Sequence, residues 1–294
     1  MSLALHRRSL LAALFVGVLL LSGCTGPNQP VSDALPSPSG TPHDSRLIDV
    51  DGHGLYLDCK GSGSPTVVYV HGWTDKRTHV PHEGAEAIQT LLADDHRVCL
   101  YDRRNVGSSE TVDAAQTPDD MLHDMEGVLA NGGVEPPYIL MAASFGGLLA
   151  YSFLNHHPDQ VSGVVFLDAF FPDELALDAY LPADKTFQHF QDDDMCCTLE
   201  RINEYALIDG LQQYIGHEPA IPMIYLAAAQ GPRGGWNPKS PDYSPHFTEA
   251  QQAFVDRFSP GELRWVDAPH FMEPEIPDVI AQAVRDVAAG AETG

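Results

Sequence analysis

The sequence predicts an α/β fold, in which a mostly parallel sheet carries helices on both faces. Two continuous apolar runs, TVVYVHG and HRVCLYD, are typical of strands that are buried on both sides. Helix signals alternate with such runs along the chain, and this alternation favours parallel strands connected by helices. With 294 residues, of which 44% are apolar, the chain is long enough for one large α/β domain or two small ones.

The individual elements follow in chain order. Asp-Gly and Gly turns predict an opening hairpin, formed by RLIDVDG and LYLDCKG. The remaining strands are expected at TVVYVHG, HRVCLYD, PYILMAA, VSGVVFLDA, PMIYLAAA and LRWVDA. The helix over 119–133 has a clear start, because Thr117 can cap it and Pro118 fits its first turn. Further helices are expected at 146–156, near 248–258 and, after the last strand, to about 289.

Residues 172–220 interrupt this alternation. They contain no run that fits a strand of the sheet, and an insertion of this length between two strands is interpreted as a helical cap. The acidic run at 192–194 within it is interpreted as a solvated loop rather than a metal site.

The first residues have the pattern of an export signal. The basic run HRR precedes an apolar stretch, Leu10–Leu21, that is too short for a comfortable membrane span. It ends in LSGC, which resembles the lipobox of bacterial lipoproteins. This resemblance implies a signal peptide over 1–23, a lipid on Cys24 and anchoring to the outer face of a bacterial cell membrane. The alternative is an ordinary secretory signal with an incidental cysteine, and the choice between general and twin-arginine export stays open.

The segment 24–45 is rich in Pro, Ser and Gly and has little to bury, so we expect a disordered tether there. The folded domain would then span 46–290. The chain contains 16 Lys and Arg against 41 Asp and Glu, a formal net charge of −25. This charge repels nucleic acids and anionic lipid headgroups, so neither is expected as an electrostatic partner.

The stretch YILMAASFGG, residues 138–147, places a serine at the end of a buried strand. A strand, a sharp turn with Ser144 at its apex and an immediate helix form a nucleophile elbow. Such a turn requires small residues two positions before and two positions after the serine, where Ala142 and Gly146 stand. The N-terminus of the following helix favours negative charge beside the serine.

These motifs resemble the α/β-hydrolase family over residues 46–290. The resemblance implies the α/β-hydrolase fold, with a mostly parallel eight-stranded sheet, helices on both faces and a helical cap insertion. It implies Ser144 as nucleophile and, in LRWVDAPHF, His270 as its base. VVYVHGW resembles the oxyanion loop, so the backbone N–H groups of Trp73 and Phe145 are expected to form the oxyanion hole. Trp73 as a simple pocket residue is the alternative.

YDRRNVGSSE resembles the family's loop after the fourth strand. Asn105 stands where the family often has glycine, and asparagine is the next best residue at positive φ. Asp102 in this loop and His71 in the oxyanion loop are expected to be structural. The pair of histidines in HVPHE, residues 79–83, could bind a metal, but no third ligand is predictable and no metal site is expected.

The third catalytic residue has two candidates. The family commonly places the acid after the seventh strand, where the first carboxylate here is Asp242, well beyond the usual distance. Some members carry it at the end of the sixth strand, where Asp168 stands. We favour Asp168, provided that the loop AFFP folds inward. Its alternative role is to cap its own loop.

Apart from Cys24, four cysteines remain, and four cysteines allow three pairings. In the family the second strand lies beside the fourth, which makes a disulfide between Cys59 and Cys99 plausible. Cys196 and Cys197 are adjacent in the cap, and the sequence leaves open whether they form a vicinal disulfide, stay as thiols or bind other partners.

The resemblance predicts a cofactor-free serine hydrolase, acting most readily on carboxylic esters of small molecules, with Ser144, His270 and Asp168 as its triad. An amidase or aminopeptidase shares this triad, and haloperoxidase-like activity is a side reaction of such sites. Epoxide hydrolases and haloalkane dehalogenases carry Asp at the elbow, so Ser144 argues against both. A binding lipoprotein without activity is the alternative of another class. The substrate and the oligomeric state stay open.

Overall fold

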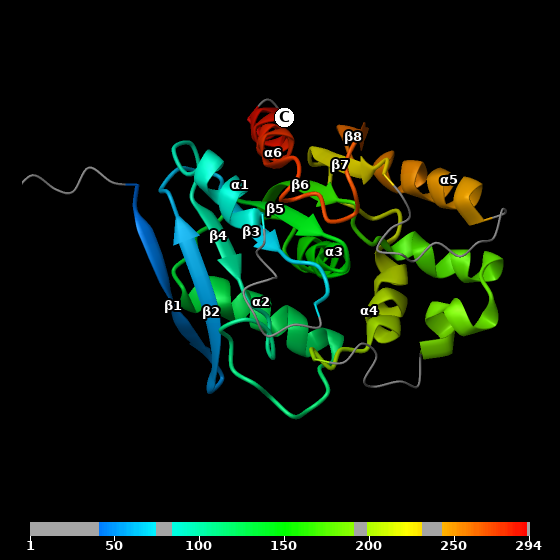
Figure 1. Ribbon diagram of the computed structural model, residues 1–294, viewed down its shortest axis with the longest axis horizontal. Coiled ribbons are helices and arrows are strands. Elements are labelled where there is room, and N and C mark those ends of the chain that lie inside the picture. Colours follow the sequence, from blue (N-terminus) through cyan, green and yellow to red (C-terminus); the bar gives the residue numbers. More distant parts are fainter. Residues whose placement is uncertain (1–40, 75–83, 191–198, 231–242, 293–294) are drawn as a thin grey trace, which may run out of the picture. The chain divides into compact units, whose positions relative to one another are not determined.

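The computed structural model describes residues 41–74, 84–190, 199–230 and 243–292 of the chain. These residues build an 8-stranded sheet in the order β1-β2-β4-β3-β5-β6-β7-β8, shown in Figure 1. The strands are β1 (His43–Val50), β2 (His53–Lys60), β3 (Thr66–Val70), β4 (Val98–Tyr101), β5 (Tyr138–Ala143), β6 (Val161–Leu167), β7 (Met223–Ala228) and β8 (Gly261–Val266). β2 pairs antiparallel with β1 and β4, and the pairs from β4 through β8 are parallel. The predicted mostly parallel eight-stranded sheet is confirmed.

The opening hairpin forms at the predicted turn. Asp51 and Gly52 have φ angles of 50° and 84°, and two positive φ angles in a two-residue turn match the right-handed twist of the strands. β1 begins at His43, however, and not at the expected domain start, Arg46. Residues 43–45 pair with 58–60 of β2 although their side chains are exposed, because the antiparallel ladder uses only backbone groups.

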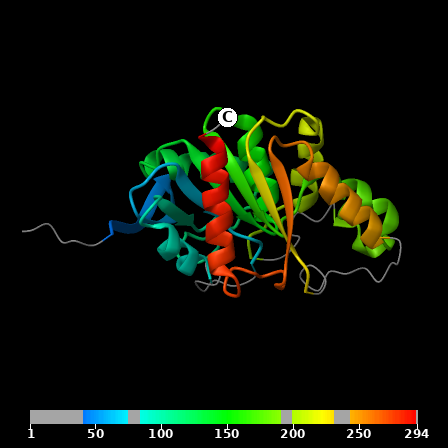
Figure 2. The ribbon, with the colours of Figure 1, turned by 90° about the horizontal axis from the view of Figure 1, so that it is seen from above.

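Helices cover both faces of the sheet (Figures 1 and 2). α1 (Ala85–Leu92) and α6 (Pro277–Ala291) share one buried cluster with the side chains of Val67 and Tyr69. α2 (Pro118–Asn131), α3 (Gly146–His156) and α5 (Tyr243–Val255) lie on the opposite face, where Val68 and Val70 join the other cluster. Successive residues of β3 therefore supply two separate cores, as the period of a strand requires.

The helix boundaries follow local signals where these are strong. Thr117 Oγ accepts from the Asp120 N–H at 3.1 Å, and the Asp120 carboxylate accepts from the Thr117 N–H at 2.9 Å, so α2 begins as predicted. α5 differs from the expectation near 248–258, because it begins at Tyr243. Its first turns pack on the residues that follow β6: Phe247 lies 5.7 Å from Phe171, and His246 stacks on Tyr180.

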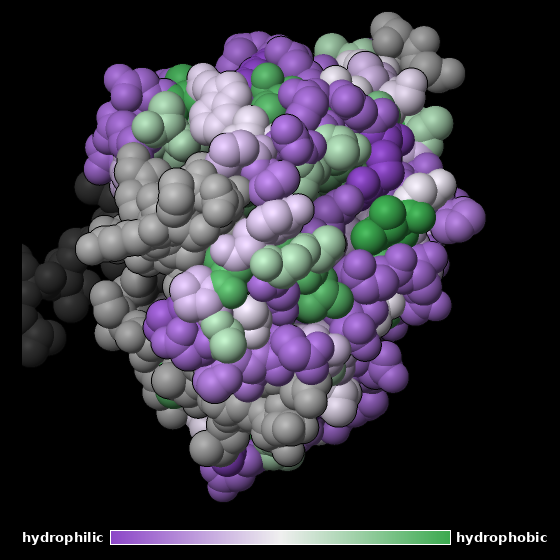
Figure 3. Space-filling model, turned by 90° about the vertical axis from the view of Figure 1, so that its right-hand side faces the viewer, coloured by the Kyte–Doolittle hydropathy of each residue, from purple (hydrophilic) through white to green (hydrophobic). Residues whose placement is uncertain are grey.

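The insertion at 172–220, here called the cap segment, is helical in its described parts, 172–190 and 199–220. It contains the short helices η2 (Pro172–Tyr180), η3 (Ala183–Lys185), η4 (Phe187–Phe190), α4 (Glu204–Gly210) and η5 (Leu211–Tyr214), and only α4 is an α-helix. Leu207, Ile208 and Leu211 are buried and belong to the same core cluster as α2 and α3. Figure 3 shows that the face on this side of the molecule is mostly hydrophilic, with a few small hydrophobic patches.

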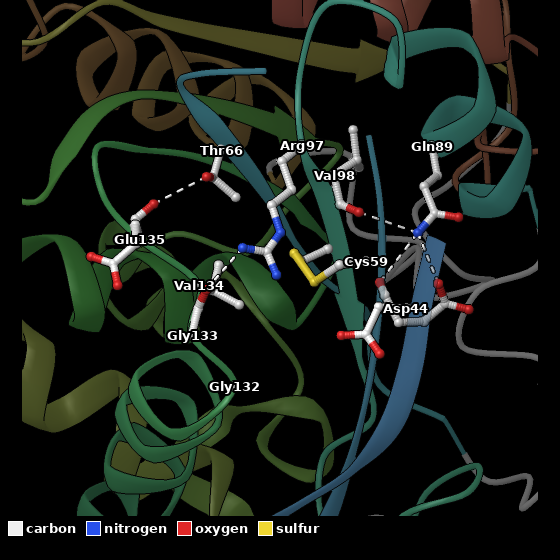
Figure 4. Close-up of a disulfide and its surroundings, with 12 residues drawn as sticks. Asp44, Cys59, Thr66, Gln89, Arg97, Val98, Gly132, Gly133, Val134 and Glu135 are labelled. Atoms are coloured by element: carbon white, nitrogen blue, oxygen red, sulfur yellow. Dashed lines mark hydrogen bonds between the residues drawn. A yellow bond between two sulfur atoms is a disulfide. The ribbon is translucent and has the colours of Figure 1, made fainter. Parts of the chain in front are cut away.

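The predicted disulfide between Cys59 and Cys99 is present. The two residues are direct partners in the β2–β4 ladder, and their Cα atoms lie 4.1 Å apart. Polar contacts surround the bond (Figure 4): Gln89 of α1 donates to the Val98 carbonyl at 3.2 Å, and Arg97 donates to the Gly133 carbonyl at 2.8 Å. Cys196 and Cys197 lie outside the described residues.

The export signal over 1–23, Cys24 and most of the tether also lie outside the described residues. Within the ranges that the structure covers, none of the helices combines the length and the apolar character that a membrane span requires.

We predict that reduction of the Cys59–Cys99 disulfide lowers the free energy of unfolding by about 3 to 4 kcal/mol, because a crosslink over a separation of 40 residues restricts the unfolded chain. The measurement is urea unfolding with and without reductant, in a background carrying Cys196→Ser and Cys197→Ser so that one disulfide alone can change. The control, Cys59→Ala with Cys99→Ala, should respond to neither condition. Equal stability of the reduced and oxidised parent would contradict the prediction.

Candidate active site

Ser144 lies in a strained turn between β5 and α3. Its φ of 49° is rare for a residue with a side chain. Three backbone hydrogen bonds hold the turn: the Ser144 N–H donates to the Leu167 carbonyl at 3.2 Å, and the Ser144 carbonyl accepts from the N–H groups of Gly147 and Phe170 at 3.0 and 2.8 Å. Strain of this kind persists only where the surroundings over-determine it, and it concentrates at functional sites. The geometry is that of the predicted nucleophile elbow.

The residues around the turn are small because backbone atoms approach closely there. A Cβ on Gly146 would lie 2.2 Å from the Val70 carbonyl oxygen, and a Cβ on Gly72 would lie 3.1 Å from the Ser144 Cβ. Ala142, at the position where the elbow pattern usually has glycine, is fully buried. The end of β3 and the loop that follows it are therefore pressed directly against the serine.

His270 connects Ser144 to a carboxylate. It follows β8, and its Nε2 lies 3.0 Å from the Ser144 Oγ, while its Nδ1 lies 2.7 Å from the Asp168 Oδ2. The side chains of His270 and Asp168 are each only 7% exposed. With the proton on Nδ1, the imidazole donates to Asp168, and its free Nε2 accepts from the Ser144 hydroxyl. The structure thus brings the three predicted residues into one hydrogen-bonded chain.

Asp168 is held in place by the neighbouring strand and by the loop that follows it. Its N–H donates to the Leu226 carbonyl at 2.8 Å, and its Oδ1 accepts from the Ala228 N–H at 3.3 Å. Its φ of 41° turns the chain sharply at the end of β6. The loop AFFP folds inward as the assignment required. Asp242 lies outside the described residues.

The aromatic pair of this loop anchors it on both sides. Phe171 is fully buried and stacks on Phe254 of α5 at 5.2 Å, and Phe170 packs edge-on against Phe187 of the cap segment at 6.3 Å. Tyr225 of β7 donates a hydrogen bond to the carbonyl of Ala169. The position of Asp168 therefore depends on contacts with α5, β7 and the cap segment together.

The two residues expected to form the oxyanion hole lie on either side of Ser144. Phe145 follows it directly, opens α3 and is buried. Trp73 follows Gly72, whose Cα packs against the serine, and its side chain is 39% exposed. Beyond the loop, Phe271 is 61% exposed and its ring lies 5.0 Å from the His270 ring. Two exposed aromatic side chains thus adjoin the site.

The loop after β4 has the structural role predicted for it. Asn105 has a φ of 69°, as expected where the family often has glycine, and its side-chain oxygen accepts from the Val112 N–H at 2.6 Å. The Asp102 carboxylate accepts from the Ser108 N–H at 2.7 Å and fills the space where a Cβ on Gly107 would stand. His71, also predicted as structural, is buried, and its ring contacts backbone groups of Gly72 and Arg103.

Sequence reasoning missed two buried polar contacts next to these residues. The Tyr69 hydroxyl donates to the Glu273 carboxylate at 2.7 Å, which ties the loop carrying His270 to β3. Burial raises the pKa of both Tyr69 and Glu273. The second contact is an ion pair between Arg103 and Glu200, with nitrogen and oxygen 2.7 Å apart. Neither pair has a local pattern, because the partners are 204 and 97 residues apart.

A carboxyl group in the cap segment has a strongly shifted pKa. Burial, together with the neighbouring Glu174 carboxylate, raises the pKa of Glu204 to about 8. The protonated form therefore predominates at pH 7, and Glu204 contributes a neutral group rather than a charge to the first turn of α4.

No group of three or more His, Cys, Asp and Glu side chains within the described ranges is placed to hold a metal ion. The histidines of HVPHE, including His79 and His82, lie outside those ranges.

Comparison with known proteins agrees with this geometry. The family model for the alpha/beta hydrolase fold matches residues 65–195. A thermophilic esterase from Thermogutta terrifontis superposes with a TM-score of 0.56 at 17% identity, over 85% of this chain and 99% of the other. A haloalkane dehalogenase variant from Bradyrhizobium elkanii gives a TM-score of 0.60 at 15% identity, over 86% and 98%. At these identities the likeness concerns the fold alone.

Sequence relatives match over shorter stretches. The uncharacterized protein YbdG of Bacillus subtilis is 25% identical over 128 residues, which are 44% of this chain and 38% of YbdG. An AB hydrolase superfamily protein of Gibberella zeae is 33% identical over 86 residues, which are 28% of this chain and 27% of that protein. The chain thus spans well under two thirds of the curated relatives it matches. Together with the observed sheet, these matches show that the chain has the alpha/beta hydrolase fold.

We predict that Gly146→Ala destabilises the protein by about 1 to 3 kcal/mol or more, because the added methyl group would overlap the Val70 carbonyl. The control is Gly210→Ala at the end of α4, where no atom lies within 4 Å of the new Cβ and the φ is negative. That variant should be neutral or stabilised by up to about 1 kcal/mol. Urea unfolding measures both, and equal effects would contradict the packing account of the elbow.

Proposed function

We propose that the protein is a serine hydrolase that cleaves carboxylic esters through an acyl-enzyme on Ser144. The observation that carries the proposal is the hydrogen-bonded chain from Ser144 through His270 to Asp168 at a strained turn. Serine is a weak nucleophile unless a base in hydrogen-bond contact removes its proton, and His270 is in that position. The fit of this arrangement to a superfamily of hydrolases adds support.

In the proposed reaction, His270 Nε2 takes the proton from Ser144 as the Oγ attacks the ester carbonyl. The N–H groups of Trp73 and Phe145 stabilise the negative charge that develops on the carbonyl oxygen. His270 then returns the proton to the departing alkoxide, which leaves as the alcohol. Water, activated by the same imidazole, releases the acid and regenerates Ser144. Asp168 keeps the imidazole in the required tautomer and stabilises its charged form.

The surroundings of the site favour substrates with an apolar group. Phe271 has a large exposed aromatic side chain next to the His270 ring, and Trp73, also exposed, directly follows Gly72, which packs against Ser144. Aromatic rings in such positions bury apolar surface at little cost in side-chain freedom. We expect esters with longer acyl chains to be cleaved more efficiently than acetates. A panel of p-nitrophenyl esters of rising acyl length, with the matching anilides alongside, tests this and separates an esterase from an amidase.

Two alternatives remain distinguishable by experiment. An amidase with the same triad would cleave the anilides at rates comparable to the esters. A binding protein without activity would leave a fluorophosphonate unreacted, because that reagent needs an activated serine. An amidase would use the same contacts among Ser144, His270 and Asp168, so the substrate panel decides between it and an esterase. A binding protein would leave the hydrogen-bonded base and acid without a role.

We predict that Ser144→Ala abolishes fluorophosphonate labelling and lowers ester turnover by about 10⁶-fold, because the triad acts as a unit. Asp168→Asn should lower kcat by about 10⁴-fold with the fold intact, since asparagine permits the wrong tautomer of His270. Stopped-flow ester hydrolysis measures the loss of turnover in each variant, and circular dichroism checks that the fold is intact.

Matched controls for Asp168→Asn are Asp267→Asn, in the loop that carries His270, and Asp242→Asn. Asp267 accepts from the Gln230 side chain at 2.9 Å and does not contact the imidazole. Both controls should retain activity within a few-fold. Near-normal activity of Asp168→Asn, with loss in Asp242→Asn, would sink the assignment of the acid.

The location of the protein is a separate proposal. The basic run HRR, the apolar stretch Leu10–Leu21 and LSGC support export and lipid attachment at Cys24. The domain would then act at the outer face of the membrane, tethered by the Pro-rich segment that follows. A single acyl chain gives only marginal membrane binding, so a stable anchor at Cys24 requires more than one chain.

We predict that Cys24→Ser shifts the protein from the membrane fraction to the soluble fraction and leaves the specific activity of the domain unchanged, because Cys24 precedes β1, the first strand of the domain. Fractionation of a bacterial host and mass spectrometry of the mature N-terminus check this. An unmodified Cys24 in the mature protein would end the lipoprotein proposal and leave the hydrolase proposal standing.

A further inference from the structure

A buried ion pair joins the loop after β4 to the part of the cap segment that precedes α4. The Arg103 Nε lies 2.7 Å from the Glu200 Oε2, and its Nη2 lies 2.9 Å from the Glu200 Oε1. The side chains are 3% and 0% exposed. Burial by itself would lower the pKa of Arg103, but the Glu200 carboxylate more than offsets this, and the pKa is raised. With two such contacts, the guanidinium and the carboxylate form a bidentate pair.

The pair also binds the backbone of the loop that contains Trp73. Arg103 Nη1 donates to the His71 carbonyl at 2.7 Å, and Nη2 donates to the Gly72 carbonyl at 2.9 Å. Glu200 Oε1 accepts from the Thr74 N–H at 3.1 Å. The two charged groups thus hold backbone groups immediately before and immediately after Trp73. This loop has no regular secondary structure to hold it, so these contacts define its path.

Arg103 touches the other side of the site as well. Its guanidinium carbon lies 5.3 Å from the centre of the Phe145 ring. A planar guanidinium stacks well on an aromatic face. One buried side chain thus contacts Phe145 and the Gly72 carbonyl, which belongs to the same peptide group as the Trp73 N–H.

We propose that Arg103 and Glu200 are positioning residues for the oxyanion hole, and that Glu200 makes the geometry of this hole depend on how the cap segment is seated. The proposal rests on the proposed serine-hydrolase function. Glu200 lies in the cap segment shortly before α4, and its carbonyl accepts from the side chain of Gln116, in the loop that precedes α2. A displacement of this segment would remove the partner of Thr74 and one anchor of Arg103. Oxyanion stabilisation requires donors fixed before the reaction begins, so small shifts of the loop lower turnover.

A second ion pair in the molecule provides a matched control. Arg257 makes two hydrogen bonds to the Asp173 carboxylate, at 2.9 and 2.6 Å, and its guanidinium lies 5.2 Å from the centre of the Phe254 ring. Like the Arg103 pair, it joins the cap segment to the rest of the domain, and Arg257 also contacts the Glu218 carboxylate at 2.6 Å. None of these partners of Arg257 belongs to the loop at 71–74. A purely structural effect of losing an ion pair would appear at both positions.

The first experiment compares Glu200→Gln and Arg103→Lys with Asp173→Asn and Arg257→Lys. The first two should lower kcat for the best ester by about 10- to 100-fold with KM changed by less than about 3-fold, since a misplaced donor weakens the transition state more than the substrate complex. They should lose affinity for a trifluoromethyl ketone, whose adduct carries an oxyanion, by a similar factor. The control pair should lose stability without either change.

Removing one buried charge can prevent folding, so the double variant Arg103→Met with Glu200→Met is the second arm. Replacing both members of a buried pair by apolar residues is often neutral or stabilising. This variant should fold, and its kcat should fall as in the single variants. Normal turnover in a folded double variant would overturn the proposal, as would equal kcat losses in the two control variants.

Hydrogen exchange provides a readout that needs no activity. In Glu200→Gln the backbone amides of residues 71–74 should exchange at least about 10-fold faster than in the parent, because Thr74 loses a charged acceptor, while Asp173→Asn should leave them unchanged. Unchanged exchange in Glu200→Gln overturns the positioning role. If the parent neither cleaves esters nor reacts with a fluorophosphonate, the proposed function fails, and the exchange result still decides whether the pair positions the loop.

Discussion

The close packing of three strand ends around Ser144 is the constraint on which the site depends. The serine is held at a positive φ because its N–H bonds to the end of β6, while Gly72 after β3 packs against its side chain. These contacts exist only because β3, β5 and β6 are parallel neighbours, whose carboxyl ends meet at one edge of the sheet. The same edge carries Asp168 and the loop with His270. The sheet order therefore brings the nucleophile, the base and the acid together.

Buried polar groups then fix the loops that the sheet alone leaves undetermined. Each of the three loops at this edge is held by a different partner. The loop with His270 is tied to β3 through Glu273 and Tyr69, and the loop with Asp168 is anchored by its aromatic pair. The loop with Trp73 is bound by Arg103 and Glu200. A buried charge without a partner is costly, so these pairs specify one arrangement of the loops rather than adding much net stability.

The cap segment contributes to the site at two places. Its Phe187 packs on Phe170 in the loop after Asp168, and its Glu200, before α4, holds the loop with Trp73. Its helices are too short to be stable alone. The helices α4 and η5 are stabilised by burial of Leu207, Ile208 and Leu211 in the core cluster that also contains residues of α2 and α3. The insertion that the sequence predicts as a helical cap thus contributes to the geometry of the acid and of the oxyanion loop alike.

The sequence by itself determined the strand positions, the elbow at Ser144 and the cap of α2, because each follows from a local pattern of burial, turn or capping residues. The choice of His270 came from the resemblance to the α/β-hydrolase family, which places its histidine after the last strand. Asp168 could be favoured from its place after β6, but its contact with His270 depends on aromatic packing between segments far apart in the chain. The tertiary structure alone decided the start of β1 at His43, the start of α5 at Tyr243 and the Arg103–Glu200 pair. Backbone pairing, packing on a distant helix and a long-range ion pair leave no periodic signal, since the free energy that selects them comes from partners elsewhere in the chain.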